Sequence, residues 1–347
     1  MNVILKEVFG IDVANNELVI SYGCLKSDLN IDIVAHKVVK NTETGFCTFL
    51  IWAKSQSSSS APFRVVMEAT GNYHQKFAYF LLEKGCEVSI VLPNKISNYQ
   101  RTLQVKTITD KSMSECIARF GLERKLDLWQ APQAIFRSIQ QLTRERNQLV
   151  DERSVIKNQK HAEELEAYPN AKTLERLQAR IVFLNQQESE IKKELGSLID
   201  SDAKLKDAVD KVCTIPGVGR LTVATVLGET NGFELVRKKR QLVSYCGYDV
   251  VEKTSGTSVK GKTRMSKKGN VHIRKAMHLP ALSAIRHDIN FRGFYKRLVE
   301  KSGVKMKGVV AVSRKLLELI FVLFTKNERY DLRYEENKAA TRLVAAL

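Results

Sequence analysis

The first 130 residues alternate between short apolar runs and polar turns, a pattern typical of a mixed α/β domain. Strands are expected at residues 7–14, 16–23 and 31–39, with a turn at Asn15-Asn16 that makes the first two a hairpin. There follow a helix over 42–55, a Ser-rich loop, a strand over 63–70, a helix over 72–85, a strand over 86–93 and a helix beginning near Asp110. Three strands followed by alternating helices and strands is the element order of an RNase H-like fold.

The pattern changes between residues 134 and 200, where apolar residues recur at alternating spacings of three and four. The clearest series, interrupted by Glu188, contains Leu174, Leu177, Ile181, Leu184, Ile191, Leu195 and Leu198. A looser apolar stripe lies upstream, and the segment "AYPNAK" provides a turn between the two. The spacing predicts a helical hairpin or coiled coil. It fits an arm within one chain and a dimer interface equally well.

Residues 205–330 form a third block, which is mainly helical by its apolar spacing. Its segment "IPGVG" places Gly217 and Gly219 between two helical stretches, as in the hairpin of a helix-hairpin-helix module. Such a turn presents backbone N–H groups to a phosphate, although an ordinary turn between helices gives the same pattern. We therefore expect an α/β RNase H-like domain at 1–130, a coiled-coil arm at 131–204 and a mainly α domain at 205–347.

Charge narrows the choice of partners. The chain of 347 residues has a formal net charge of +18, which favours a polyanionic partner, with nucleic acid as the first candidate. An anionic membrane surface is the weaker candidate, because no apolar run is long enough for a membrane span. The N-terminus lacks the basic-then-apolar layout of a signal peptide, so a cytoplasmic protein is expected.

Residues 254–276 form a basic segment, "TSGTSVKGKTRMSKKGNVHIRKA", without a single carboxylate. We expect its cations to contact phosphates, since each contact adds salt-dependent affinity; a solvated face is the alternative. The candidates are Lys260, Lys262, Arg264, Lys267, Lys268, Arg274 and Lys275. Ser255 precedes Gly256 at the front of this segment. An isolated serine is usually a surface residue, but a hydroxyl among cations can attack a phosphodiester when a base or metal activates it.

Three acids occupy related places in the N-terminal pattern. Asp12 ends the first predicted strand, Glu68 ends the strand over 63–70, and Asp110 opens a helix. In an RNase H-like sheet these positions converge on one edge, where carboxylates can hold Mg²⁺ for phosphoryl transfer. Taken singly, each acid is also explained as a solvated loop residue or, for Asp110, as a helix N-cap.

The motifs together resemble those of a known family. "GIDVA", "VMEATGNYH", "KTITDK", a helical arm, "IPGVG" and "SG…SKKGNVHIRKAM" occur in the order found in insertion-sequence 110 transposases, also called DEDD or Piv-like transposases. The resemblance covers nearly the whole chain. It implies a RuvC-like N-terminal domain, a coiled-coil insertion and a C-terminal transposase domain.

The resemblance also implies a site. In that family a carboxylate quartet binds Mg²⁺ and a serine is the nucleophile, and the matching positions here are Asp12, Glu68, Asp110 and Ser255. Some members are guided by a structured bridge RNA that pairs with donor and target DNA. The family's fourth acid, three residues after the third, is replaced here by Met113, a poor ligand for a hard cation.

Two nearby residues are candidates for the missing ligand. Ser114 could contribute through water, whereas Glu115 lies about 140° round a helix from Asp110. We interpret the chain as a transposase or recombinase that cuts and joins DNA through a phosphoserine intermediate and acts as a dimer or tetramer. The alternatives are a Holliday-junction nuclease of the RuvC type that uses water, and a non-catalytic nucleic-acid-binding relic.

Overall fold

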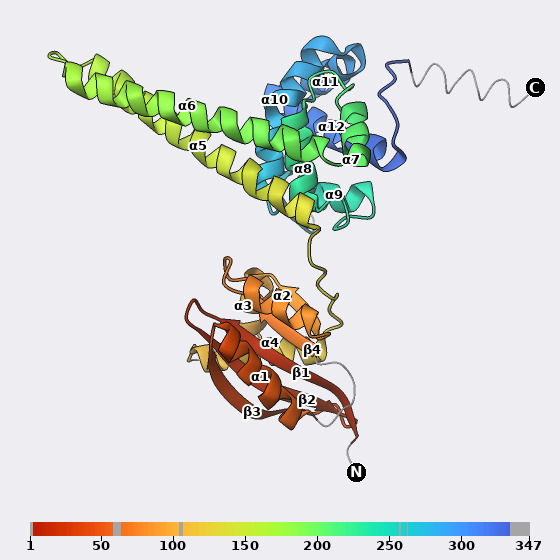
Figure 1. Ribbon diagram of the computed structural model, residues 1–347. Coiled ribbons are helices and arrows are strands. Elements are labelled where there is room, and N and C mark those ends of the chain that lie inside the picture. Colours follow the sequence, from red (N-terminus) through yellow and green to blue (C-terminus); the bar gives the residue numbers. More distant parts are fainter. Residues whose placement is uncertain (1–2, 58–63, 104–106, 257, 262, 334–347) are drawn as a thin grey trace, which may run out of the picture. The chain divides into compact units, whose positions relative to one another are not determined.

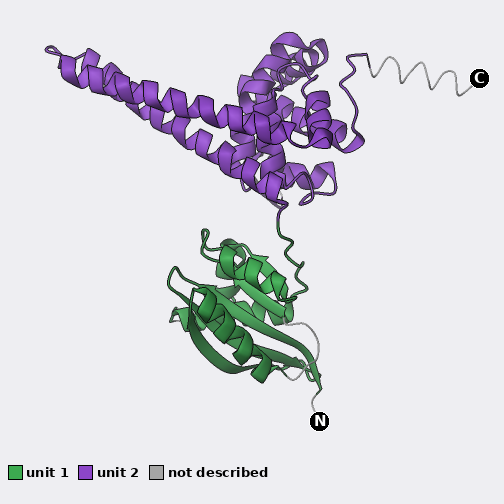
Figure 2. Cartoon of the chain, in the orientation of Figure 1, with its two compact units in different colours: residues 1–131 green, residues 132–347 purple. Residues whose placement is uncertain are grey.

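The computed structural model describes residues 3–57, 64–103, 107–256, 258–261 and 263–333. The chain divides into two compact units, residues 1–131 and 132–347 (Figure 2). Because the arm helices and the C-terminal helices share the second unit, the boundary predicted near residue 204 lies inside it. The division into three domains stays a prediction.

The N-terminal unit contains a five-stranded mixed sheet (Figure 1). Its strands are β1 (Ile4–Val13), β2 (Glu17–Lys26), β3 (Ile31–Lys40), β4 (Arg64–Glu68) and β5 (Glu87–Val91). They lie in the order β3-β2-β1-β4-β5, and β2 is antiparallel to both of its neighbours, whereas β1, β4 and β5 are parallel. This topology is RNase H-like, as the element order predicted.

Helices cover both faces of this sheet because its strands are apolar on both sides. Phe9 and Ile11 of β1 belong to the core formed with α1 (Glu43–Gln56) and α2 (Gln75–Glu83). Val8 of β1 and Val66 of β4 belong to the core on the other face, formed with α3 (Pro93–Gln100) and α4 (Asp110–Glu123). Alternation along a strand therefore assigns the even-numbered residues of β1 and β4 to the face of α4.

Helix α4 lies very close to β1. A Cβ atom built on Gly10 would come within 2.2 Å of the backbone nitrogen of Ala118, so only glycine permits this contact. The helix begins with a capping box in which the Thr109 hydroxyl accepts from the backbone N–H of Ser112. Asp110 is therefore the first residue of the helix, and the alternative interpretation of Asp110 as the N-cap is wrong.

The predicted arm is a pair of long helices, α5 (Ala134–Glu164) and α6 (Ala171–Asp200), that form a hairpin in the C-terminal unit (Figure 1). Ile156, Ile181 and Leu184 make a small core between them, whereas Ile191 and Leu195 join the larger core of the C-terminal helices. Glu188, which interrupts the apolar series, is buried and paired with Arg146, Arg153 and Lys192.

The remainder of the C-terminal unit is mainly helical, as expected. Its helices are α7 (Ala203–Val212), α8 (Arg220–Thr230), α9 (Lys239–Tyr245), α10 (Val271–His287), α11 (Ile289–Ser302) and α12 (Lys305–Lys326). Two small antiparallel ladders pair β6 (Val250–Val251) with β9 (Arg264–Met265) and β7 (Thr254–Ser255) with β8 (Val259–Lys260). None of the helices in the described ranges is long and apolar enough to cross a membrane.

Candidate functional site

Two of the predicted acids lie at adjacent strand ends. Asp12 is the penultimate residue of β1 and Glu68 is the last residue of β4. These strands are parallel, with Ile11 opposite Met67, so Asp12 and Glu68 take the next positions along the same edge. Both are even-numbered residues on the face that α4 covers. Register and alternation thus bring the two carboxyl groups together.

The third acid reaches this edge from α4. The pKa of Asp12 is raised, mainly because burial disfavours its charged form and also because Asp110 carries a like charge nearby; a hydrogen bond from the Val13 backbone opposes the shift. Burial likewise raises the pKa of Glu68, and the charge of Asp12 raises it further. Asp12 is therefore within electrostatic reach of both other acids.

The donor chemistry of this edge suits a hard divalent cation, because carboxylate oxygens are the ligands that Mg²⁺ prefers. Burial and mutual repulsion disfavour the charged forms of Asp12 and Glu68, and a bound cation would stabilise these charged forms. In the part of the chain that the structure describes, however, no group of three or more His, Cys, Asp or Glu side chains could hold a metal ion. The acids are neighbours rather than a closed coordination shell, so their assignment as ligands stays a prediction.

The candidates for the fourth ligand are engaged elsewhere. Met113 packs against the core between α4 and the sheet. Ser114 is buried, and its hydroxyl donates to the Lys111 carbonyl at 2.8 Å and lies 2.6 Å from the Ser21 hydroxyl. Glu115 Oε1 lies 3.3 Å from His36 Nε2, over β3. This arrangement anchors α4 to the sheet through the residues that follow Asp110.

Ser255 belongs to the other unit, so the structure describes it separately from the acids. It is exposed at the end of β7, where it pairs with Val259 of β8. Gly256 begins the connecting turn with a φ of +55°, a conformation that favours glycine, and a Cβ built on it would meet nothing within 4 Å. The serine hydroxyl thus lies on an open hairpin that a nucleic-acid backbone can approach. Its role as nucleophile stays a prediction.

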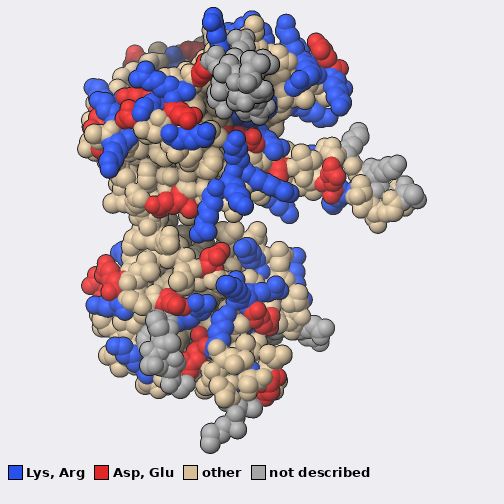
Figure 3. Space-filling model, turned by 90° about the vertical axis from the view of Figure 1, so that its right-hand side faces the viewer, with Lys and Arg blue, Asp and Glu red and all other residues tan. Residues whose placement is uncertain are grey.

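The basic segment divides into exposed cations and cations held by the protein. Figure 3 shows Lys and Arg gathered on one face of the C-terminal unit, with scattered Asp and Glu among them. Arg264, Lys267 and Lys268 are exposed, Lys260 lies in β8, and Lys262 lies outside the described residues. Arg274 instead donates to the carbonyls of Cys246 at 2.7 Å and Gly269 at 3.0 Å, and Lys275 pairs with Asp151 at 2.5 Å.

The two glycines of "IPGVG" have different surroundings. Gly217 has a φ of +88°, and a Cβ there would come within 2.6 Å of the Ser283 Cβ in α10. Gly219 is the N-cap of α8, and a Cβ there would meet nothing within 4 Å. Gly217 therefore serves the packing of this turn against α10, whereas Gly219 leaves the start of α8 open.

Sequence reasoning missed a buried network at the end of the basic segment. The Glu229 carboxylate, which is 1% exposed, accepts from Arg144 of α5 at 2.7 and 2.9 Å and from Asn270 at 2.7 Å. Asn270 also caps α10 by accepting from the Ile273 N–H. The network joins the base of the arm to the basic segment. Its only signal in the sequence is an acid within the otherwise uncharged stretch "TVATVLGET".

Comparisons with known proteins agree with this architecture. A model of DEDD transposases of the IS110 type matches residues 9–168, and the model of the transposase IS116/IS110/IS902 family matches residues 209–296. The chain is 26% identical over 338 residues to the pilin gene-inverting protein of Moraxella bovis, covering 95% of this chain and 99% of that protein. It is 24% identical over 297 residues to the transposase of IS1111A from Coxiella burnetii, covering 77% and 79% respectively.

Among solved structures, the chain is similar to Thermus thermophilus RuvC with a TM-score of 0.28 and 14% identity, over 36% of this chain and 100% of that one. An RNase H-like unit followed by a helical unit, both matched by transposase models, defines an enzyme of DNA recombination. The chain belongs to the IS110 family of transposases.

Proposed function

We propose that this protein cuts and joins DNA strands through a covalent phosphoserine intermediate at Ser255. The observation that carries the proposal is the electrostatic coupling of Asp12 with Glu68 and Asp110 at one sheet edge, in a chain of the IS110 family. Clustered carboxylates on an RNase H-like sheet suit phosphoryl transfer, whereas a purely nucleic-acid-binding protein has no need of them.

In the proposed reaction, the Ser255 hydroxyl oxygen forms a bond to phosphorus and the bond from phosphorus to the departing sugar oxygen breaks. The serine proton passes by way of solvent to that sugar oxygen. The hydroxyl oxygen of another DNA end then forms a bond to this phosphorus and the bond from phosphorus to the Ser255 oxygen breaks. The proton of the attacking hydroxyl passes by way of solvent to the Ser255 oxygen, which restores the serine. The cations near Ser255 favour the charge that develops during attack.

Asp12, Glu68 and Asp110 are the proposed ligands of Mg²⁺, which when bound neutralises charge on the attacked phosphate. The protein's own part is to keep these carboxyl groups at one edge. Their raised pKa values mean that Asp12 and Glu68 give up their protons at higher pH than ordinary carboxyl groups do. Metal binding should therefore weaken as the pH falls.

The proposed partners are donor and target DNA and a structured guide RNA. Exposed Arg264, Lys267 and Lys268 support contacts with phosphates, and the formal net charge of +18 supports a large polyanionic surface. Because strand exchange joins four DNA ends, we propose a dimer or tetramer with the arm as a contact between copies. We further propose that the reaction takes place in the cytoplasm.

The test is denaturing electrophoresis of the full chain with labelled DNA that carries the ends of the element, in the presence of Mg²⁺. Wild type is expected to give a covalent protein–DNA adduct and Ser255→Ala none. Ser258→Ala is the matched control, since Ser258 is exposed in the same hairpin, and it should keep the adduct.

Three results would contradict the assignment. A phosphoserine mapped to Ser258 or Ser266 would identify a different nucleophile. DNA cleavage that continues in Ser255→Ala, without an adduct in any variant, would support the nuclease that uses water. Binding without cleavage in every variant, under conditions where a related transposase acts on its own ends, would support the non-catalytic relic.

A further inference from the structure

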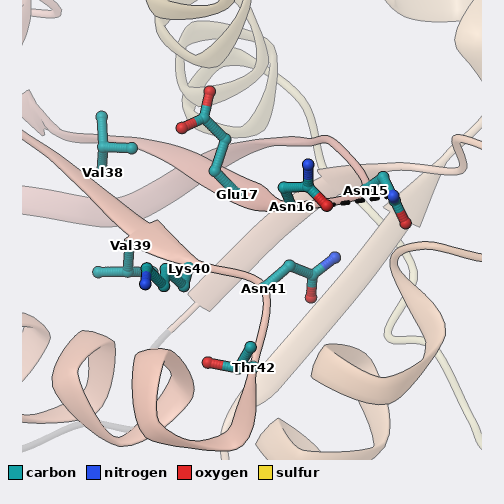
Figure 4. A pocket seen from close by; sticks show the side chains of 8 residues that line it. All are labelled: Asn15, Asn16, Glu17, Val38, Val39, Lys40, Asn41 and Thr42. Atoms are coloured by element: carbon teal, nitrogen blue, oxygen red, sulfur yellow. Dashed lines mark hydrogen bonds between the residues drawn. The ribbon is translucent and has the colours of Figure 1, made fainter.

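A hollow of about 560 Å³ opens at the turn end of the β1–β2 hairpin (Figure 4). This volume is within the range of small-ligand sites, about 300–1,000 Å³. Amide, charged and apolar side chains line the hollow, among them Asn15, Asn16, Glu17, Val38, Lys40 and Asn41.

Strand register relates the hollow to the acid edge. Asp12 is opposite Val19 in β2, and Val19 is opposite Val38 in β3, so the three residues form one row across the sheet. Directly opposed residues point to the same face, and neighbouring strands are about 4.8 Å apart. The Cα atoms of Val38 and Asp12 are thus about 10 Å apart, and their side chains are on the same face.

The rim of the hollow is held in place by hydrogen bonds. The Asn41 side-chain amide donates to the Ala14 carbonyl at 2.9 Å and to the Tyr73 carbonyl at 3.2 Å, and its backbone N–H donates to the Asn16 carbonyl at 2.9 Å. Asn15 Nδ2 donates to Asn16 Oδ1 at 3.1 Å. A ligand would enter a preformed site and need not order the chain around it.

Charged side chains of both signs line the hollow. Lys40 is paired with Glu17 across the β2–β3 ladder, and both residues line it. Val38 has 57% of its surface exposed despite being apolar. The hollow therefore offers apolar contact, amide donors and acceptors, and one charged side chain of each sign.

We propose that this hollow holds one nucleotide of the single DNA strand that leads to the phosphate at the acid edge. The side-chain amides of Asn15 and Asn16 can recognise a base edge through hydrogen bonds, whereas Asn41 uses both of its amide hydrogens on backbone carbonyls. Val38 can pack against a base or a thymine methyl group, and Lys40 can contact a phosphate. A base reaches such a hollow only out of the duplex stack, so the strand must be locally unpaired. This inference rests on the proposed function, because it takes the acid edge as the place of reaction.

The experiment uses the full chain, metal-free buffer and a fluorescein-labelled DNA single strand of mixed sequence. Val38→Glu is compared with Val34→Glu, because both valines are 57% exposed in β3 and lie four residues, or about 13 Å, apart. Lys40→Gln is compared with Lys37→Gln, since Lys37 instead lies over Trp52 on the opposite face. A strand with a photoreactive thymidine analogue then locates the contact.

Val38→Glu should weaken binding of the single strand about tenfold and Val34→Glu less than twofold. Lys40→Gln should reduce the salt slope by about 0.7, the value for one phosphate contact on a single strand, and Lys37→Gln should leave the slope unchanged. Crosslinks should map to residues 15–17 or 38–42. Equal effects within each matched pair, or crosslinks confined to the C-terminal unit, would overturn the proposal.

The outcome is separable from that of the Ser255 assay. Adduct formation by wild type without crosslinks at the hollow would refute the nucleotide subsite and leave the proposed function standing. Crosslinks at the hollow without any adduct would support binding there and refute the serine mechanism.

Discussion

Glu188 offers a direct test of how the arm is stabilised. Its side chain is 6% exposed, and its carboxylate accepts from Arg146 at 2.9 Å, from Lys192 at 2.8 Å and from Arg153. Burial alone would raise the pKa of Glu188, but the hydrogen bonds from Lys192, Arg153 and Arg146 outweigh burial and lower the pKa to about 2. We expect Glu188→Gln to destabilise the arm by leaving three cations without their counter-charge.

The size of the effect follows from the pKa. The interval from the usual 4.5 to about 2, at 1.36 kcal/mol per pH unit, corresponds to about 3 kcal/mol. Removing one partner of a buried ion pair costs a similar amount, about 3–5 kcal/mol. Because the pKa is lowered in the folded state, this stabilisation is fully present above pH 4.5. It is lost as the pH falls towards 2.

The assay is urea unfolding of the full chain at pH 7 and at pH 3, followed by circular dichroism at 222 nm. Trp52 and Trp129 both lie in the N-terminal unit, so their fluorescence provides an internal reference that should not shift. Glu190→Gln is the matched control, because Glu190 lies two residues after Glu188 on α6 and is exposed. This substitution should change the free energy of unfolding by less than about 0.5 kcal/mol. A loss that is equal in both variants, or equal at both pH values, would refute the reasoning.

Three further predictions concern the proposed reaction. Asp12→Asn, Glu68→Gln and Asp110→Asn should each abolish strand cutting, as should EDTA, while gel-shift affinity for DNA stays within about twofold; full activity in EDTA would contradict this. The folded state raises the pKa of Asp12, so the charged carboxylate destabilises the metal-free protein at pH 7, whereas at pH 3 the carboxyl group is protonated. Asp12→Asn should therefore raise the melting temperature of the metal-free protein at pH 7 and not at pH 3. Lys267→Gln combined with Lys268→Gln should reduce the salt slope on duplex DNA by about two, and an unchanged slope would make these lysines a solvated face.

Arg274 is not combined with Lys267 and Lys268 in the salt-dependence experiment, because its side chain contacts the protein backbone. Its guanidinium holds the Cys246 and Gly269 carbonyls, so replacing it would disturb the loop before α10 as well as remove a charge. A drop in affinity for an Arg274 variant could not be read as the loss of a phosphate contact.

Local patterns predicted the elements well. Alternation located β1, β2 and β3, the Asn15-Asn16 turn joined the right strands, and the spacing of three and four located α6. These features depend on neighbouring residues in the sequence. The convergence of Asp12 with Glu68 also followed, because the element order of the fold implies which strands are adjacent.

Features that depend on contacts between distant segments were not predictable. Glu188 reads as an interruption of the apolar series, since Arg146 and Arg153 come from the other helix of the arm. Arg274 reads as a free cation, because its carbonyl partners are single backbone atoms that no pattern marks. In the same way, the crowding of Gly217 by α10 depends on a residue more than sixty positions away.

The contact at Gly10 has a consequence for how this enzyme can lose activity. The separation between the strand of Asp12 and the helix of Asp110 is set there by two backbones that touch, so it is insensitive to the volume of the surrounding side chains. A single methyl group at position 10 would act as a spacer and push the helix outwards. Every charged residue would remain in the sequence, and Asp12 and Glu68 would keep their places, yet Asp110 would move away from them. Under the proposed mechanism, a change at a position that carries no functional group would therefore inactivate the enzyme.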